Sequence, residues 1–107
     1  MSETGSGYKV GEIVQVKKGR DTGKYAVVLE IVNERYVLIV DGDRRKYDNP
    51  KKKNVIHLRS TGIVSKEVIT SVMEENRISN AKLRYVIQEY MNGLEESMGK
   101  KGELIHE

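Results

Sequence analysis

The hydrophobic period of this sequence changes once along the chain, and that change limits the folds it can adopt. Between residues 12 and 59, apolar residues alternate with polar ones or form brief apolar runs, as they do in β-strands. From Val64 onward they recur at intervals of three and four, as they do on one face of an α-helix. The sequence therefore predicts a β-module followed by helices.

Five strands are expected in the β-module, at residues 12–17, 25–32, 35–40, 43–47 and 54–59. The apolar run at residues 26–29 predicts that the second strand is buried on both faces. Asp41-Gly42 is a strong hairpin signal, because a tight primed turn needs positive φ at both central residues. Pro50 breaks the chain before the last strand. Short strands joined by tight turns predict a small five-stranded barrel or rolled sheet.

Two helices are expected after the strands, over residues 65–77 and 80–98, with Ser65 and Ser79 as their N-caps. The apolar stripe of the second helix consists of Leu83, Val86, Ile87, Tyr90, Met91 and Leu94. Gly99 is expected to end this helix. We expect the stripe to pack on the barrel, on the first helix or on a partner.

The predicted fold class is therefore mainly β with α, as a barrel followed by a helical hairpin. The predicted organisation is a flexible tail (1–8), the barrel (9–61), the hairpin packed on the barrel or a partner (62–98) and a second flexible tail (99–107). The first residues do not resemble a signal peptide, and no run approaches the roughly 18–20 apolar residues of a membrane span. Cysteine is absent. We expect a cytoplasmic protein without membrane association.

Charge is distributed unevenly between the two parts of the chain. Residues 9–59 contain 13 Lys and Arg against 7 Asp and Glu, whereas residues 60–107 contain 6 against 8. A polyanion-binding module benefits from such a concentration of positive charge, because Lys and Arg neutralise phosphates and release counterions. Nucleic acid is therefore the partner that the composition favours.

The basic residues cluster around the predicted first loop and on both sides of the break at Pro50. In a small barrel these loops can converge on one side. Tyr25, Tyr36 and Tyr47 could offer stacking faces to unpaired bases, and Tyr47, which lies among charges, is expected to be the most exposed of the three. The candidate RNA-binding residues are Lys17, Lys18, Gly19, Arg20, Lys24, Arg44, Arg45, Lys46, Tyr47, Lys51, Lys52 and Lys53.

Catalytic chemistry is hard to place in this sequence. It has two histidines, about fifty residues apart, and no Gly-rich phosphate loop or nucleophile elbow. Asp41 and Asp43 flank Gly42 and could suggest a metal pair, but the Asp-Gly turn explains them. We therefore predict a protein that is not an enzyme, without catalytic residues, metal or cofactor.

Several segments together resemble a KOW motif. They are GEIVQV at residues 11–16, KGRDTGK at 18–24, YAVV at 25–28, VLIVDG at 37–42 and NVIHL at 54–58. The resemblance is to the ribosomal large-subunit fourteen-e family and covers about residues 10–61. Residues 62–107 have no counterpart in it.

The resemblance implies a Src-homology-3-like barrel and binding to RNA, usually ribosomal. It implies that the contacts lie on the loop at residues 17–24 and on the basic stretch before the last strand, with Gly23 at positive φ. Similar short KOW proteins occur in Gram-positive bacteria, which implies a ribosome- or RNA-associated accessory protein rather than a stably bound ribosomal subunit protein.

Two other functions remain open from the sequence. The barrel and the apolar helix face could serve as a protein-binding or self-associating module. A DNA-binding regulator could use the helices as a helix-turn-helix, with Lys82 and Arg84 as its basic residues. Against this, the second helix also has Glu89, Glu95 and Glu96, which a phosphate backbone would repel.

Overall fold

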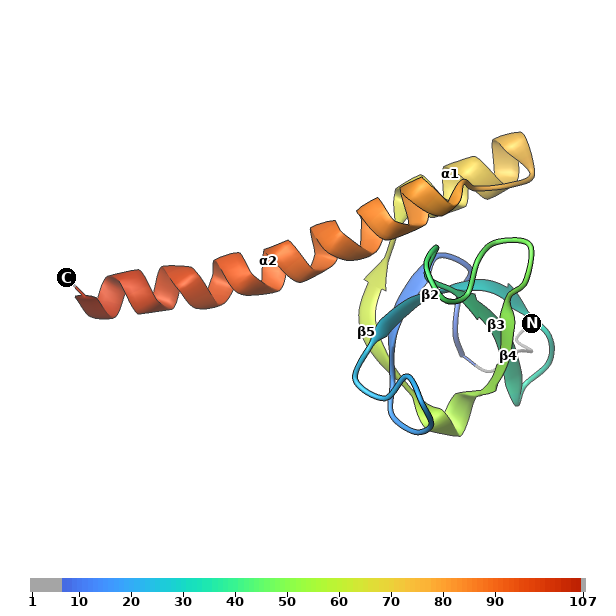
Figure 1. The fold of residues 1–107 in the computed structure, drawn as a ribbon, viewed down its shortest axis with the longest axis horizontal. Coiled ribbons are helices and arrows are strands. Elements are labelled where there is room, and N and C mark those ends of the chain that lie inside the picture. Colours follow the sequence, from blue (N-terminus) through green and yellow to red (C-terminus); the bar gives the residue numbers. More distant parts are fainter. Residues whose placement is uncertain (1–6, 107) are drawn as a thin grey trace.

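The computed structural model describes the backbone of residues 7–106 and the side chains of residues 7–94. Residues 1–6 of the predicted N-terminal tail lie outside the described residues, as do the side chains of the predicted tail at 99–107. Five strands come first and two helices follow (Figure 1), as the change of hydrophobic period predicts. Neither helix, over its described residues, has the length and apolar character that crossing a membrane requires.

The five strands form one antiparallel sheet in the order β4-β3-β2-β1-β5. They are β1 (Glu12–Val16), β2 (Tyr25–Ile31), β3 (Tyr36–Val40), β4 (Lys51–Asn54) and β5 (Leu58–Val64). The first three strands begin and end within one residue of the positions that the alternating pattern predicts.

The fourth strand does not form where it was predicted, at residues 43–47. This segment is a loop, because the Asp41 carboxylate accepts hydrogen bonds from the backbone N–H groups of Asp43 (2.8 Å) and Arg45 (2.9 Å). The backbone N–H of Tyr47 donates instead to Oδ1 of Asn80, at 2.8 Å. Donors that a strand would offer to its neighbour are thus used elsewhere, and β4 begins only at Lys51.

The predicted strand at residues 54–59 was also misplaced. Residues Val55–His57 form a turn of 3-10 helix, η2, which Asn54 caps by accepting the backbone N–H of Ile56 at 3.0 Å. Single backbone hydrogen bonds attach this turn to the sheet on two sides, from Lys17 N to His57 O (2.8 Å) and from Val55 N to Arg35 O (2.8 Å).

The sheet is strongly rolled (Figure 1) but does not close, so of the predicted barrel or rolled sheet the structure shows the rolled sheet. Strands β4 and β5 are its two edges and form no ladder with each other in the described sheet. In the chain, η2 lies between these two edge strands and connects them.

Strand β2 is buried on both faces, as the apolar run at residues 26–29 predicts. The inner face of the roll holds one cluster, made of Val14, Val16, Ala26, Val28, Val37, Ile39 and Leu58. The other face packs against the helices in a second cluster, made of Ile13, Val27, Val40, Val68, Ile78, Leu83, Val86 and Ile87. Successive residues of β1 and β2 point to opposite faces, so each strand contributes to both clusters.

The helices pack in cis on the outer face of the sheet. Helix α1 (Lys66–Glu75) begins at the predicted cap, where Oγ of Ser65 accepts the backbone N–H of Val68 at 3.3 Å. Helix α2 (Asn80–His106) begins after Ser79, whose Oγ accepts the backbone N–H of Lys82 at 3.0 Å. It continues through Gly99, where the sequence predicted its end, to His106.

Candidate nucleic-acid interface

The loop between β1 and β2 presents four basic side chains. Gly19 and Gly23 adopt the expected positive φ, +105° and +90°. Gly23 N donates to Val16 O at 2.7 Å, so the loop turns back onto its own strand. This tight turn leaves its cations in solvent: Lys17, Lys18, Arg20 and Lys24 are all exposed.

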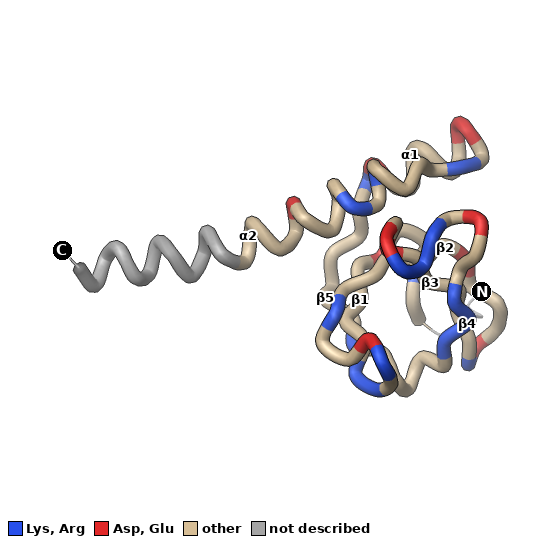
Figure 2. The backbone as a smooth tube through the Cα atoms, viewed as in Figure 1, with Lys and Arg blue, Asp and Glu red and all other residues tan. Residues whose placement is uncertain are grey.

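The loop between β3 and β4 carries the second group of cations. Here Arg44 forms an ion pair with Asp21 of the first loop, with Nη1 and Oδ1 3.1 Å apart. Arg45 is half-buried, and its buried Nε has no hydrogen-bond partner among the residues that the structure describes. Lys46 is exposed. Figure 2 shows Lys and Arg along both loops and β4, with acidic residues interspersed.

The three lysines of β4 do not point to the same side. Lys51 and Lys53 pair across the ladder with the buried Ile39 and Val37, so they share the inner face of the sheet. Lys52 points to the opposite face, where its ammonium lies 4.8 Å from the ring centroid of Tyr36. The run of three lysines therefore contributes two side chains to one surface and one to another.

Lys53 joins β4 to the first loop by donating from Nζ to the backbone carbonyl of Lys18 at 2.9 Å. Around this contact the protein forms a hollow of about 300 Å³ that we call the basic hollow. Its lining residues are Gly19, Arg20, Asp21, Arg45, Lys51 and Lys53. Segments about thirty residues apart in the sequence thus meet at one place, with four cations and one carboxylate around it.

Other candidate residues lie outside the lining of the basic hollow. Five of them are exposed cations of the two loops: Lys17, Lys18, Lys24, Arg44 and Lys46. Lys52 points to the opposite face of the sheet, and Tyr47 packs against the helix-facing core, so neither lines the basic hollow.

Tyr47 is less available for stacking than the sequence suggested. It is half-buried against the helix-facing core, and its hydroxyl donates to the backbone carbonyl of Asn76 at 2.9 Å. The guanidinium of Arg77 lies 5.5 Å from its ring centroid. Tyr25, Tyr36 and Tyr47 are all half-buried, so the expectation that Tyr47 is the most exposed of the three stays a prediction.

Sequence reasoning missed Asp21, which lines the basic hollow and neutralises part of its charge. Its position between Arg20 and Thr22, inside the basic loop, was the available signal. In the described part of the chain, no three His, Asp or Glu side chains gather as a metal site would require. The arrangement offers charge and hydrogen-bond donors to an anion.

Comparisons with known proteins identify a relative. No protein-family model matches the chain, so the resemblance to the fourteen-e family stays a hypothesis. The sequence is similar to "Putative ribosome-binding protein YbzG" of Bacillus subtilis (strain 168), with 35% identity over 71 residues. The aligned region covers 96% of that protein and 66% of this chain.

Proposed function

The chain belongs to the family of the Bacillus subtilis protein YbzG, and from this premise we propose that it is a ribosome-associated protein that binds ribosomal RNA through the basic hollow. It acts by binding and not by catalysis. The observation that carries the proposal is the convergence of Arg20, Arg45, Lys51 and Lys53 around one hollow. A ribosome partner would place the protein in the cytoplasm.

Two features of the hollow suit an RNA backbone. Arg45 lines the hollow as a half-buried residue, and its guanidinium group can donate charge-assisted hydrogen bonds to a phosphate oxygen. The stems of Lys51 and Lys53 are half-buried, which limits the side-chain freedom that binding would remove. The exposed cations of the two loops would add contacts that depend on salt and carry little sequence preference.

The KOW resemblance is part of this proposal. The expected positive φ of Gly23 is present, and the rolled five-stranded sheet is compatible with an open Src-homology-3-like barrel. The loop at residues 17–24, on which the resemblance puts the RNA contacts, forms one wall of the basic hollow through Gly19, Arg20 and Asp21.

The proposal is tested by measuring RNA affinity against salt concentration for two double variants. Lys51→Ala with Lys53→Ala removes two cations of the hollow. Lys52→Ala with Lys66→Ala removes two cations that lie outside it, so the change in net charge is the same. Each lost phosphate contact flattens the log–log salt slope by about 0.7 to 0.9 units. We expect a loss of about 1.5 units for the first variant and little change for the second.

If the two variants have equal slopes of log affinity against log salt concentration, the basic hollow does not contact RNA. Sedimentation of the protein through a sucrose gradient with ribosomes tests the partner separately. Wild-type protein should travel with ribosomal particles at low salt and leave them at high salt, since contacts to phosphates are screened. A protein that stays at the top of the gradient at low salt would refute ribosome association.

A second candidate function, a protein-binding module, is supported by a different surface. Ile63 (49% exposed) and Tyr85 (54% exposed) border a hollow of about 380 Å³ between the end of β5 and α2. Exposed apolar side chains of this size are found at protein contacts. A complex that survives nuclease and high salt would favour this function over RNA binding.

The DNA-binding alternative loses its basic residues to contacts within the protein. Lys82 donates from Nζ to Oγ of Ser71 at 3.2 Å, and Arg84 donates from Nη1 to the carbonyl of Gly42 at 2.6 Å. Both side chains therefore tie α2 to its neighbours, which disfavours their use in a DNA groove.

A further inference from the structure

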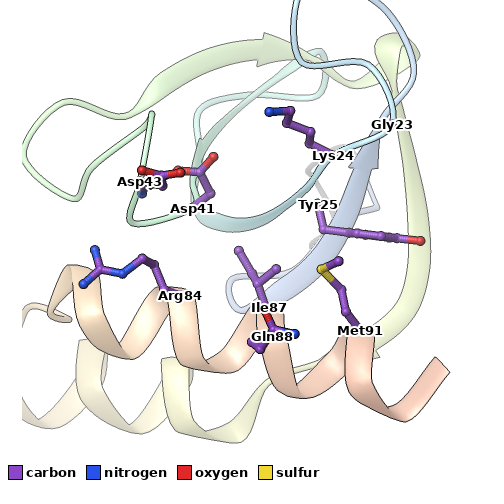
Figure 3. A pocket seen from close by; sticks show the side chains of 9 residues that line it. All are labelled: Gly23, Lys24, Tyr25, Asp41, Asp43, Arg84, Ile87, Gln88 and Met91. Carbon is purple, nitrogen blue, oxygen red and sulfur yellow. Dashed lines mark hydrogen bonds between the residues drawn. The ribbon is translucent and has the colours of Figure 1, made fainter. Parts of the chain in front are cut away.

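A cleft of about 440 Å³ lies between α2 and the ends of the two basic loops (Figure 3). Tyr25, Ile87 and Met91 form its apolar part, with Met91 beside Tyr25 at one end. Its charged groups are Lys24, Asp41, Asp43 and Arg84. We call this site the mixed cleft. Its volume lies in the range of pockets that hold small organic groups.

The charges of the mixed cleft do not favour an isolated phosphate. Lys24 and Arg84 contribute two positive charges, and Asp41 and Asp43 contribute two negative ones, so the cleft is close to neutral. This distinguishes it from the basic hollow, where cations outnumber the single carboxylate. A neutral group with both donors and acceptors on its edge suits such a site better.

The walls of the cleft are held in place by contacts within the protein. The ring of Tyr25 packs edge-to-face on Tyr90, with centroids 5.1 Å apart. The guanidinium of Arg84 is anchored by its 2.6 Å hydrogen bond to Gly42 O. A flat aromatic group could therefore enter without first ordering these side chains, and both Tyr rings and Arg guanidinium planes stack on nucleobases.

The free polar groups match one base better than the others. Within the described residues, the backbone N–H of Asp43 donates to Asp41, but no hydrogen bond or ion pair uses the Asp43 carboxylate, which can therefore accept from N–H groups. Guanine offers such donors on its Watson–Crick edge, and its O6 and N7 accept from a cation such as Lys24. Adenine has an amino donor but lacks the O6 acceptor.

The residues that line the mixed cleft are close in sequence to those that line the basic hollow. Gly23 and Lys24 follow the hollow's residues in the first loop, and Asp43 precedes Arg44 and Arg45 in the second. We propose that this cleft binds an unpaired guanine base of the RNA whose backbone crosses the basic hollow. The inference rests on the proposed function and narrows its ligand to RNA with an extruded purine.

The test compares three RNA duplexes in competition binding with the full chain: one fully paired, one with a single bulged guanine and one with a single bulged adenine. Stacking of one base contributes enough to change affinity by about tenfold. We expect the wild-type protein to prefer the guanine bulge over the paired duplex by about this factor. A smaller preference is expected for the adenine bulge.

Two exposed residues of the cleft supply the variants, each with a matched control. Asp43→Asn should abolish the preference for guanine over adenine, whereas Asp48→Asn, on the same loop, makes the same change in charge and should preserve it. Met91→Ala should reduce the preference for both bulges. Met73→Ala, at an exposed methionine of α1, should leave both unchanged.

The outcomes separate this inference from the proposed function. Equal binding of all three RNAs, with the effect of Lys51 and Lys53 retained, would refute the base site alone. Failure to bind any of them would refute the proposed function as well. A further experiment captures ribosomal proteins on the chain after nuclease treatment. If Asp43→Asn weakens this capture but keeps the preference for the guanine bulge, the cleft binds a basic protein side chain and the inference is wrong.

Discussion

Arg84 of α2 donates a hydrogen bond from Nη1 to the backbone carbonyl of Gly42, with a distance of 2.6 Å. The contact joins the helices to the loop that carries Arg44 and Arg45. Gly42 lies so close to α2 that an added Cβ would overlap the backbone oxygen of Asn80 and lie 3.0 Å from Cβ of Leu83. The helices thus hold the basic loop in position.

Gly42→Ala should therefore destabilise the fold strongly. A side chain at φ +80° costs about 1–2 kcal/mol, and overpacking against α2 adds about 1–3 kcal/mol. We expect a total of about 3 kcal/mol, measured by urea unfolding. Gly62→Ala is the matched control, because Gly62 has the same φ of +80° and no atom within 4 Å of the added Cβ. Equal losses for the two variants would contradict the close approach of α2.

The tight hairpin that the sequence predicted at Asp41-Gly42 does not form. Of the two residues only Gly42 has positive φ (+80°), and a longer loop joins β3 to β4. Local signals sufficed for β1, β2, β3 and both helix caps, because alternation and capping residues act over a few positions. Residues 43–47 have the polarity of an exposed edge strand. Two kinds of contact prevent a strand there: the local hydrogen bonds to the Asp41 carboxylate, and the hydrogen bond from Tyr47 N to Asn80, a residue 33 positions away. A contact at such separation leaves no trace in local periodicity.

Leu83→Ala should show that helices and sheet share one core. Leu83 is fully buried in the cluster that also contains Ile13, Val27 and Val40 of the sheet. Its truncation should lower the free energy of unfolding by about 2–5 kcal/mol while preserving a single cooperative transition. Leu94→Ala removes the same atoms from a residue of α2 that is 41% exposed, and should cost less than about 1 kcal/mol. If the β-sheet of Leu83→Ala unfolds at the same urea concentration as the β-sheet of the wild type, the helices and the sheet do not share one core.

Asp21→Asn should strengthen RNA binding with little change in stability. The ion pair between Asp21 and Arg44 joins side chains that are 20% and 57% exposed, so its loss should change stability by less than about 1 kcal/mol. The substitution removes the carboxylate from the basic hollow and releases Arg44 for phosphate contact. Glu34→Gln, in the exposed turn between β2 and β3, makes the same change in charge. We expect the affinity to rise several-fold more for Asp21→Asn, and equal increases would place Asp21 outside the interface.

The candidate site could be predicted in composition but not in arrangement. The sequence indicates which loops are basic, because charge is visible residue by residue. It does not show that Lys52 turns away from Lys51 and Lys53, since that depends on the β3–β4 register and on the position at which β4 begins. The opposing carboxylate of Asp21 also becomes part of the site only when both loops are folded.

Tyr8 should make the fold sensitive to alkaline pH. Its hydroxyl donates to the backbone carbonyl of Leu58 at 3.4 Å, and the side chain is half-buried. Burial raises the pKa of the Tyr8 phenol, and the nearby carboxylate of Glu12 raises this pKa further. The folded protein thus holds the phenolic proton more tightly than the unfolded chain does.

Below the ordinary tyrosine pKa of about 10, both states keep the proton and the contribution of Tyr8 to stability is fully present. As the pH rises above this value, the unfolded chain ionises first, and stability falls until the folded state ionises as well. Tyr8→Phe should therefore lose less stability than the wild type between about pH 9 and pH 11, measured by urea unfolding across that range. Tyr85→Phe, at an exposed tyrosine, controls for ionisation elsewhere in the chain. If Tyr8→Phe and Tyr85→Phe lose the same free energy of unfolding over this pH range, the burial of Tyr8 does not affect the stability of the fold at high pH.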